Sequence, residues 1–578
     1  MSPLWLLTAA LLATSTLLPP EIHPAGRVVA HLLSAVAALA LGFAPGRVAG
    51  GGSSRRGAWL LAPLACASFL LVDGGRARGL DEAAAIACFA VAFFAGRRIG
   101  AGTEQVKSLG AVAALLGVVI AAQAMAQHHW AYPETAAALR AAQDPAVDPF
   151  LVRLEAGRPS GPFSLPAALA GFLALSLPMT LFALRTARPS VWRAAWSAAI
   201  VVQMYALLLT RSLGGLLGAT VACAFALAPP GRESGQDDGR ARGRATRVAI
   251  AAGLLFAAVA VVFVYSRRAE IGSHPGADPL SLRLGNWRAA VEMMRDHPIL
   301  GVGPGRFPIF YPRFIAPGMN ETQFAHNSYL QLAATWGAWA LAPLAFFVAA
   351  FSRPKERRRG AVAAAAGAGA GFLLHNAIDF TFFLPGVALP AALLLGAGSA
   401  HSIPPGLAGA QPIEANGNGE PPGRARRRAG VAVALFLLVY AATADRSAWH
   451  LERARALTQG GPSSEAEAEA RRAAAACPWD PDPWAFLAQS LLARHAATPE
   501  EETLRRVAAD RAAHLEPESA ILHHTVALDR AAAGDPAAAW IEEERAHRLY
   551  PAKALYRPQG EREAGTEPMP AAEPATER

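Results

Sequence analysis

Apolar runs long enough to cross a lipid bilayer recur along the first three quarters of the chain. A helix needs about 20 mainly apolar residues to cross the hydrocarbon core, and hydropathy predicts about thirteen such spans. The predicted spans are Pro3–Leu18 and residues 28–44, 58–72, 82–96, 108–126, 164–184, 191–209, 212–229, 247–266, 327–350, 360–376, 382–400 and 429–444. The first run lacks a basic leading segment and a clear cleavage site, so we expect an uncleaved helix. The predicted fold is all-α, a polytopic transmembrane helical bundle of about 12–13 spans.

The composition disfavours a soluble enzyme and a nucleic-acid-binding protein. Of the 578 residues, 53% are hydrophobic and only 17% are charged. The net charge is +9, but the basic residues form short clusters between apolar runs, which is typical of a cytoplasmic membrane face. Cys66, Cys88 and Cys223 lie inside apolar runs and Cys477 lies alone, so neither a disulfide framework nor a metal-ligand spacing is present. We expect no nucleic-acid partner.

The basic clusters fix the orientation of the spans. They comprise Arg47, Arg55 and Arg56; Arg97, Arg98 and Lys107; Arg185, Arg188 and Arg193; Arg232, Arg240, Arg242, Arg244 and Arg247; Arg353, Lys355, Arg357, Arg358 and Arg359; and Arg424, Arg426, Arg427 and Arg428. With an inside N-terminus, every cluster falls on the cytoplasmic side. The same rule places four segments on the outside of the membrane: the loops at 127–163 and 267–326, the turn Thr210–Ser212 and the C-terminal part.

The C-terminal part has a different composition, rich in Ala, Glu and Arg with helical periodicity. Pro478, Pro517 and Pro551 recur at intervals close to the tetratricopeptide period of about 34 residues. We therefore predict a transmembrane domain over 1–444, tetratricopeptide-like repeats over 445–556 and a disordered tail over 557–578. The alternative is an unspecialised helical hairpin packed on the membrane domain.

One polar stretch, Arg283 to Gly337, interrupts the apolar sequence and is predicted to contain the chemistry. Gly301, Gly303 and Gly305 lack the spacing of a dinucleotide fingerprint, and no phosphate-loop lysine follows. The histidines are too scattered for a metal site, and no serine-hydrolase or metalloprotease motif is present. Arginines on the outside of the membrane, together with one histidine at a helix start, suit a phosphorylated, membrane-borne substrate.

Four segments resemble the O-antigen ligase and polymerase family of bacterial membrane glycosyltransferases. Glu155–Pro178 keeps the family's Arg158, Gly161 and Phe163, although the usual asparagine is absent near Pro166. Leu207–Gly218 is similar to the Thr-x-Ser-Arg-Gly turn, with Leu213 in the arginine place and Arg211 two residues earlier. Arg283–Phe307 closely matches the large-loop motif of Arg, Trp, His-Pro and Gly-x-Gly. Ala325–Gly337 resembles the His-Asn-x-x-Leu…Gly signature, with Thr335 replacing a common Glu.

The resemblance implies a GT-C-like bundle in the bacterial inner membrane with its active face in the periplasm. It implies attack by a sugar hydroxyl on the anomeric carbon of a glycan linked to undecaprenyl diphosphate, without a metal or cofactor. Arg283 and Arg211 would stabilise the diphosphate and His326 would act on the acceptor hydroxyl, so these three are the predicted catalytic residues. The predicted substrate-binding residues are Arg158, Asn327, Trp287, Gly303 and Gly305, the last three by shaping the loop.

Each of these residues also has a structural interpretation. Arg283 and Arg211 could be interfacial anchors, and His326 could be a capping or packing histidine. His375 and Asp379 lie at the outer end of a span and could line the cleft. Two other functions stay open: a transporter or flippase of lipid-linked glycans, and an envelope scaffold acting through its repeats. The predicted partners are the lipid-linked glycan donor, a glycan, lipid or protein acceptor, membrane lipids, and an envelope-assembly protein bound by the repeats.

Overall fold

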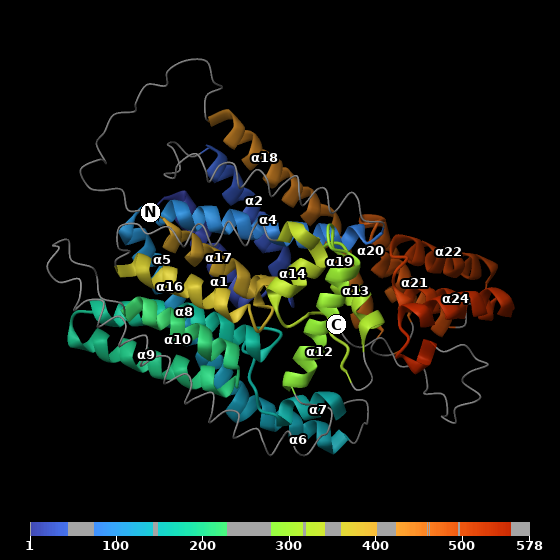
Figure 1. The fold of residues 1–578 in the computed structure, drawn as a ribbon, viewed down its shortest axis with the longest axis horizontal. Coiled ribbons are helices and arrows are strands. Elements are labelled where there is room, and N and C mark those ends of the chain that lie inside the picture. Colours follow the sequence, from blue (N-terminus) through green and yellow to red (C-terminus); the bar gives the residue numbers. More distant parts are fainter. Residues whose placement is uncertain are drawn as a thin grey trace.

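The computed structural model of the chain describes residues 2–43, 74–142, 148–227, 279–315, 319–340, 360–400, 423–458, 461, 463–494 and 498–556. Within these ranges every regular element is a helix, which confirms the predicted all-α class. The membrane helices form one bundle, and the C-terminal helices pack at one end of it (Figure 1). Helices α12 (Pro279–Asp296), α13 (Phe307–Phe310) and α14 (Ser328–Trp336) lie between these two groups.

Among the described residues, six helices are long and apolar enough to cross a membrane. They are α2 (Pro24–Phe43), α4 (Arg76–Ile99), the helix Thr103–Ala141 that begins as α5 (Thr103–Ala126), α8 (Pro166–Thr186), α9 (Ser190–Leu209), and the helix Arg426–Leu457. Shorter apolar helices are α1 (Pro3–Leu17), α10 (Leu213–Leu227), α16 (Gly360–His375) and α17 (Pro385–Ser399). These helices confirm a polytopic membrane protein. The spans predicted at 58–72 and 247–266 lie outside the described residues.

Small residues bring the helices into close contact. A Cβ atom on Gly371 of α16 would lie 2.4 Å from the carbonyl oxygen of Gly218 on α10, and one on Gly396 of α17 would lie 2.0 Å from that of Phe93 on α4. Any larger side chain would therefore separate these helix backbones. This is the packing expected where glycine and alanine allow neighbouring membrane helices to approach closely.

Two of the predicted loops contain helices, and one predicted span differs from the structure. The segment predicted as a loop at 127–163 contains helices, because α5 continues through the π-helical turn η1 (Gln127–Ala131) into α6 (Tyr132–Ala142), and α7 (Asp148–Glu155) follows. The loop at 267–326 contains α12 (Pro279–Asp296), the short helix α13 (Phe307–Phe310) and the 3-10 turn η3 (Tyr311–Phe314).

The predicted span 327–350 does not begin as one continuous helix. Helix α14 (Ser328–Trp336) ends at Gly337, whose φ of 60° and ψ of −145° are not helical. A 3-10 turn, η4 (Gly337–Ala340), follows, and residues 341–359 lie outside the described part of the chain. Glycine adopts a positive φ without the steric cost that other residues incur, so Gly337 ends the helix where the apolar sequence continues.

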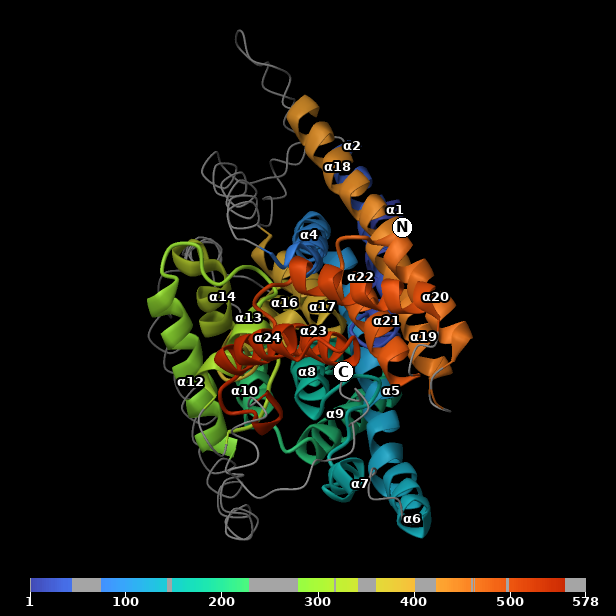
Figure 2. The same cartoon turned by 90° about the vertical axis from the view of Figure 1, so that its right-hand side faces the viewer.

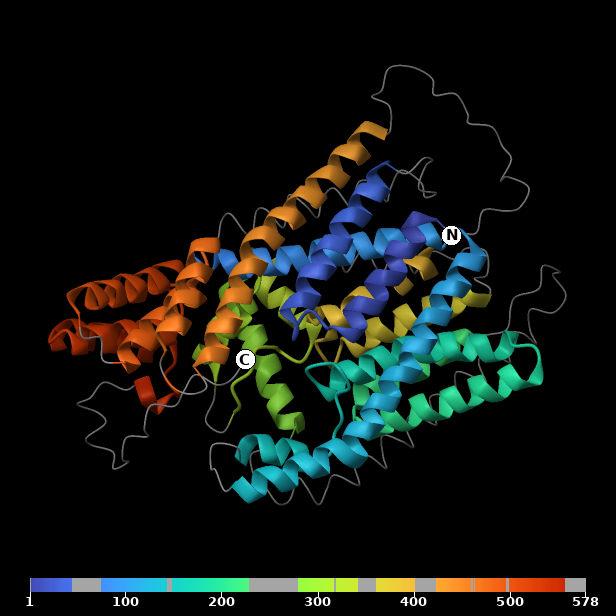
Figure 3. The ribbon, with the colours of Figure 1, turned by 180° about the vertical axis from the view of Figure 1, so that it is seen from behind.

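The C-terminal part consists of six successive helices, which Figure 2 shows stacked beside α12–α14. They are α19 (Arg446–Leu457), α20 (Ser464–Ala476), α21 (Pro481–Ala493), α22 (Pro499–Leu515), α23 (Ala520–Ala532) and α24 (Pro536–Leu549). Seen from behind, α18 (Gly423–Tyr440) runs along α2 and continues through the π-helical turn η7 (Ala441–Asp445) into α19 (Figure 3). The predicted boundary at residue 445 therefore falls inside a continuous helix. The tetratricopeptide character of these helices stays a prediction.

Candidate active site

His326 lies immediately before α14 in a constrained conformation. Asn327 is the N-cap of α14, and its side-chain oxygen accepts hydrogen bonds from the backbone N–H groups of Tyr329 at 3.0 Å and Leu330 at 3.1 Å. His326 has a φ of 55°, in the left-handed region that non-glycine residues rarely adopt. Trp287 donates from Nε1 to the carbonyl of His326 at 3.4 Å. The cap and the tryptophan thus fix the backbone of the predicted catalytic histidine.

The ring of His326 packs edge-on against Phe380, with ring centroids 4.8 Å apart. Phe324 stacks on the same phenylalanine at 4.3 Å, so aromatic side chains wall this position. Nδ1 of His326 is buried, and no described residue forms a hydrogen bond with it. A buried polar atom without a partner costs free energy, and such atoms are typical of functional positions.

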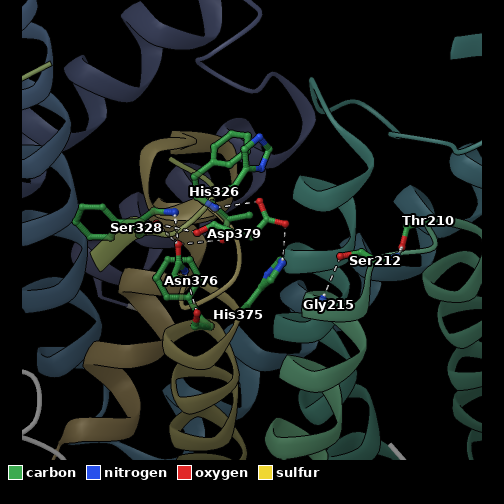
Figure 4. Close-up of polar contacts among 12 residues, drawn as sticks. Thr210, Ser212, Gly215, His326, Ser328, His375, Asn376 and Asp379 are labelled. Atoms are coloured by element: carbon green, nitrogen blue, oxygen red, sulfur yellow. Dashed lines mark hydrogen bonds and ion pairs between the residues drawn. The ribbon is translucent and has the colours of Figure 1, made fainter. Parts of the chain in front are cut away.

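The loop after α16 holds the start of α14. The backbone N–H of Ser328 donates to the carbonyl of Asn376 at 2.9 Å and to that of Asp379 at 3.0 Å. The hydroxyl of Ser328 donates to Oδ1 of Asn376 at 2.7 Å, and this oxygen also accepts the backbone N–H of Phe382 at 2.7 Å (Figure 4). These bonds join two segments that the sequence separates, and they bring Asp379 next to His326.

Asp379 forms a buried pair with His375, whose Nε2 lies 3.6 Å from Oδ2 of the carboxylate. Both side chains are almost completely buried. The ring of His375 faces the start of α10, where a Cβ atom on Gly214 would lie 2.6 Å from its Cδ2. Figure 4 shows this pair between His326 on one side and the Thr210–Gly215 turn on the other. His375 and Asp379 thus lie beside His326, and their predicted place in the lining of a cleft stays a prediction.

Burial and two nearby charges shift the pKa of His326. Burial lowers the pKa of His326 below the ordinary value, the positive charge of Arg283 lowers it further, and the negative charge of Asp379 opposes both. Burial by itself would raise the pKa of Asp379, but His375, Arg283 and His326 together hold it below its usual range. His326 is therefore neutral and Asp379 ionised near neutral pH, which is the state that a general base requires.

Arg283 lies on α12, one turn before Trp287, and its side chain is half-buried. It forms no hydrogen bond or ion pair with any other residue that the structure describes. Its charge nevertheless acts on both His326 and Asp379. A half-buried guanidinium without an internal carboxylate partner retains its donors for an external anion, and its fork geometry matches phosphate oxygens.

The two other predicted arginines meet at the turn between α9 and α10. Nε of Arg158 donates to the carbonyl of Thr210 at 2.9 Å, so the first and second family-like segments are in contact. Arg211 follows with a φ of 51° and an exposed side chain. Ser212 accepts the backbone N–H of Gly215 at 3.2 Å and caps the start of α10. The structure thus brings Arg158 and Arg211 together, and α10 connects their turn to His375.

The glycines of the large loop hold contacts within the protein. The backbone N–H of Gly303 donates to the carbonyl of Thr335 at 3.1 Å, near the end of α14. That of Gly305 donates to the carboxylate of Glu82, which also accepts Nε1 of Trp336 at 2.6 Å. Both glycines thus contact other parts of the protein, and their predicted roles in shaping the loop and binding substrate stay predictions.

Three residues of this region were not found from the sequence. Glu82 lies in a predicted span, Arg306 follows the glycines, and Glu516 lies in the C-terminal part. Arg306 and Glu516 form a buried ion pair at 2.6 Å. The available signal was weak, because Glu82 follows Asp81 at the edge of an apolar run, Arg306 follows a glycine-rich run, and Glu516 lies among many other charged residues. Among the residues that the structure describes, no group of three or more His, Cys, Asp or Glu side chains is arranged to hold a metal ion.

The comparisons with known proteins agree with the family resemblance. The family model described as O-antigen ligase matches residues 198–345. This match covers the Arg211 turn, Arg283 and the large loop, and His326 with its capping residue Asn327. No curated protein matches the chain. The resemblance predicted from the sequence is thus confirmed for this part, and the chain contains an O-antigen ligase family domain at residues 198–345.

Proposed function

We propose that the protein is a membrane glycosyltransferase that moves a glycan from an undecaprenyl-diphosphate carrier to an acceptor hydroxyl on the periplasmic face. The observation that supports this most directly is the grouping of Arg283, His326 and Asp379. Arg283, which pairs with no other residue that the structure describes, acts electrostatically on a neutral histidine and an ionised aspartate. This set provides an anion-binding group and a proton acceptor, as transfer from a diphosphate requires.

In the proposed reaction, the acceptor oxygen forms a bond to the anomeric carbon of the donor glycan. The bond between that carbon and the diphosphate oxygen breaks, and its electron pair leaves with the diphosphate. His326 accepts the proton of the acceptor hydroxyl. Arg283 stabilises the charge that develops on the diphosphate, and Arg211 with Arg158 forms a second cationic group at the neighbouring turn. Asp379 stabilises the imidazolium that forms.

The helix ends support a periplasmic position for this site. Helix α8 begins just after the Arg158 loop and has Arg185 in its last turn. Helix α18 likewise begins with the cluster Arg424, Arg426, Arg427 and Arg428. Clustered arginines mark cytoplasmic helix ends, so the site residues, which lie at the other ends, face the opposite side of the membrane.

The direct test is glycan transfer in isolated membranes supplied with a polyprenyl-diphosphate-linked glycan, with the products sized on a gel. A product one block larger than the acceptor would indicate a ligase, and a ladder would indicate a polymerase. The expected result is transfer that depends on His326. If the wild-type protein transfers no glycan from any lipid-diphosphate donor, the proposal is wrong.

The pKa of His326 should respond to its two charged neighbours in opposite directions. In the wild type it lies below the 6.5 of an ordinary imidazole. Arg283→Ala removes a positive charge that lowers this pKa, so the pKa should rise. Asp379→Asn removes a negative charge that raises it, so the pKa should fall. The pH dependence of His326 modification by diethyl pyrocarbonate, which reacts with neutral imidazole, measures both shifts. Shifts of the same sign in the two variants would contradict the site geometry.

A further inference from the structure

A buried ion pair joins the C-terminal helices to the glycine-rich loop that follows α12. Arg306 is 2% exposed and Glu516 is fully buried. Nη2 and Nε of Arg306 donate to Oε1 of Glu516 at 2.6 and 3.1 Å. Nη1 of the same guanidinium donates to the carbonyl of Val302 at 3.3 Å, and the guanidinium lies 5.0 Å from the ring centroid of Phe310. A carboxylate between α22 and α23 thus holds the loop 298–310 at its centre.

Further polar contacts surround this pair. The backbone N–H of Gly75, at the start of α4, donates to the carbonyl of Leu515 at 3.0 Å. At the edge of the interface, Glu321 accepts hydrogen bonds from Lys553 and Tyr550, each at 2.8 Å. Further ion pairs join Arg78 to Glu516 and Asp482, and Arg313 to Glu518. The C-terminal domain is therefore docked on the membrane domain through many specific polar contacts.

The loop 298–310 in turn holds the far end of α14. Val302 donates from its backbone N–H to the carbonyl of Ala334 at 2.9 Å, and Gly303 does the same to Thr335 at 3.1 Å. Helix α14 has only nine residues, and His326 lies just before its N-cap. A short helix moves as a rigid unit, so a displacement of its C-terminal end also displaces the residues at its start.

We propose that Glu516 is a positioning residue for the transfer reaction, acting through Arg306, the loop 298–310 and α14 on His326. The inference rests on the function proposed above for His326. A buried ion pair adds little net stability, because the cost of removing two charges from water offsets their attraction. Its consequence here is geometric: the C-terminal domain is part of the active form of the enzyme. A protein partner bound by the C-terminal helices would then also act on the loop 298–310 and α14.

The first experiment measures transfer by full-length protein in lipid nanodiscs, comparing the wild type with Glu516→Gln. The expected result is a fall in kcat of about 10- to 100-fold per folded molecule, the range that a displaced reactive group produces, with the KM for the donor unchanged. The matched control is Asp529→Asn, which also removes a buried carboxylate, here one paired with Arg505 at 2.7 Å inside the C-terminal domain. This control should retain wild-type kcat. Equal losses in both variants would overturn the proposal.

The second experiment requires no glycan and separates this inference from the proposed function. The rate at which diethyl pyrocarbonate modifies His326 is measured by mass spectrometry, with the exposed His129 as internal reference. We expect faster modification of His326 in Glu516→Gln at an unchanged rate for His129. If the rate for His326 is also unchanged, the proposed coupling is wrong, whether or not the wild type transfers glycan.

The double variant Arg306→Met/Glu516→Gln keeps the test valid if the single variant does not fold. It leaves no unpaired charge at Arg306, so the largest cost of the single substitution is removed. Because the double variant also lacks the contact between Glu516 and the loop, diethyl pyrocarbonate should modify His326 faster in it than in the wild type. A wild-type rate in the double variant would overturn the proposal.

Discussion

Replacing His326 with alanine is expected to lower the kcat of glycan transfer by about 10²- to 10⁴-fold, the usual contribution of a positioned general base. The Asn327 cap and the Trp287 contact hold the backbone of His326, Phe380 packs against its ring, and the depressed pKa keeps the imidazole neutral. The measurement is the initial rate of transfer in nanodiscs from a polyprenyl-diphosphate donor at saturating acceptor. The KM for the donor should change little, because His326 acts on the acceptor hydroxyl.

His129→Ala is a suitable control for this variant. His129 is exposed, and its Nε2 lies 2.9 Å from the hydroxyl of Tyr205 on α9. Its replacement should leave kcat within about twofold, since exposed substitutions away from a site are nearly neutral. Wild-type activity in His326→Ala, at equal amounts of folded protein, would exclude this histidine as the base.

Replacing Arg283 with alanine should lower kcat by about 10²- to 10³-fold, as expected for loss of one preorganised group that stabilises developing negative charge. Arg283→Lys should recover only part of this loss, because an ammonium keeps the charge but cannot bind two phosphate oxygens with a planar fork. The same transfer assay measures both variants. A direct binding measurement with the lipid-diphosphate donor would separate weaker ground-state binding from slower chemistry.

Arg288 provides the matched control on the same helix. Its side chain is 82% exposed and pairs with Glu292 one turn along α12 at 3.8 Å. Arg288→Ala removes the same charge from α12 but should leave the transfer rate unchanged, since exposed pairs of this kind contribute little. Equal losses in Arg283→Ala and Arg288→Ala would mean that α12 acts only through its overall charge.

Much of the local structure around His326 follows from neighbouring residues. The sequence His326-Asn327-Ser328 predicts a helix start, because asparagine is a favoured N-cap residue, and the structure contains the cap. The apolar runs likewise predicted most of the described membrane helices, since a stretch of about 20 apolar residues has few stable alternatives in a bilayer. The early end of α14 at Gly337 was missed, because hydropathy does not register one residue with a positive φ.

The tertiary contacts of the site could not be predicted from residues that are close together in the sequence. Ser328 bonds to Asn376, 48 residues away, and Arg306 bonds to Glu516, 210 residues away. No periodicity links such pairs, and nothing in the sequence indicates that a glycine-rich loop and the C-terminal helices share a buried ion pair. Predicting the repeats as a separate module followed from their composition, whereas their polar contacts with α4 and the large loop depend on how the helix ends meet.

The sequence alone determined that this chain is an all-α membrane protein, which residues begin α14, and which arginines and histidine belong to the family-like segments. These features depend on hydropathy, capping and motifs, which involve residues close together in the chain. Only the tertiary structure decided that Asp379 and His375 join His326, that Arg158 contacts the Arg211 turn, and that Glu516 supports the large loop. Such contacts are set by the packing of whole helices, whose ends bring distant residues together.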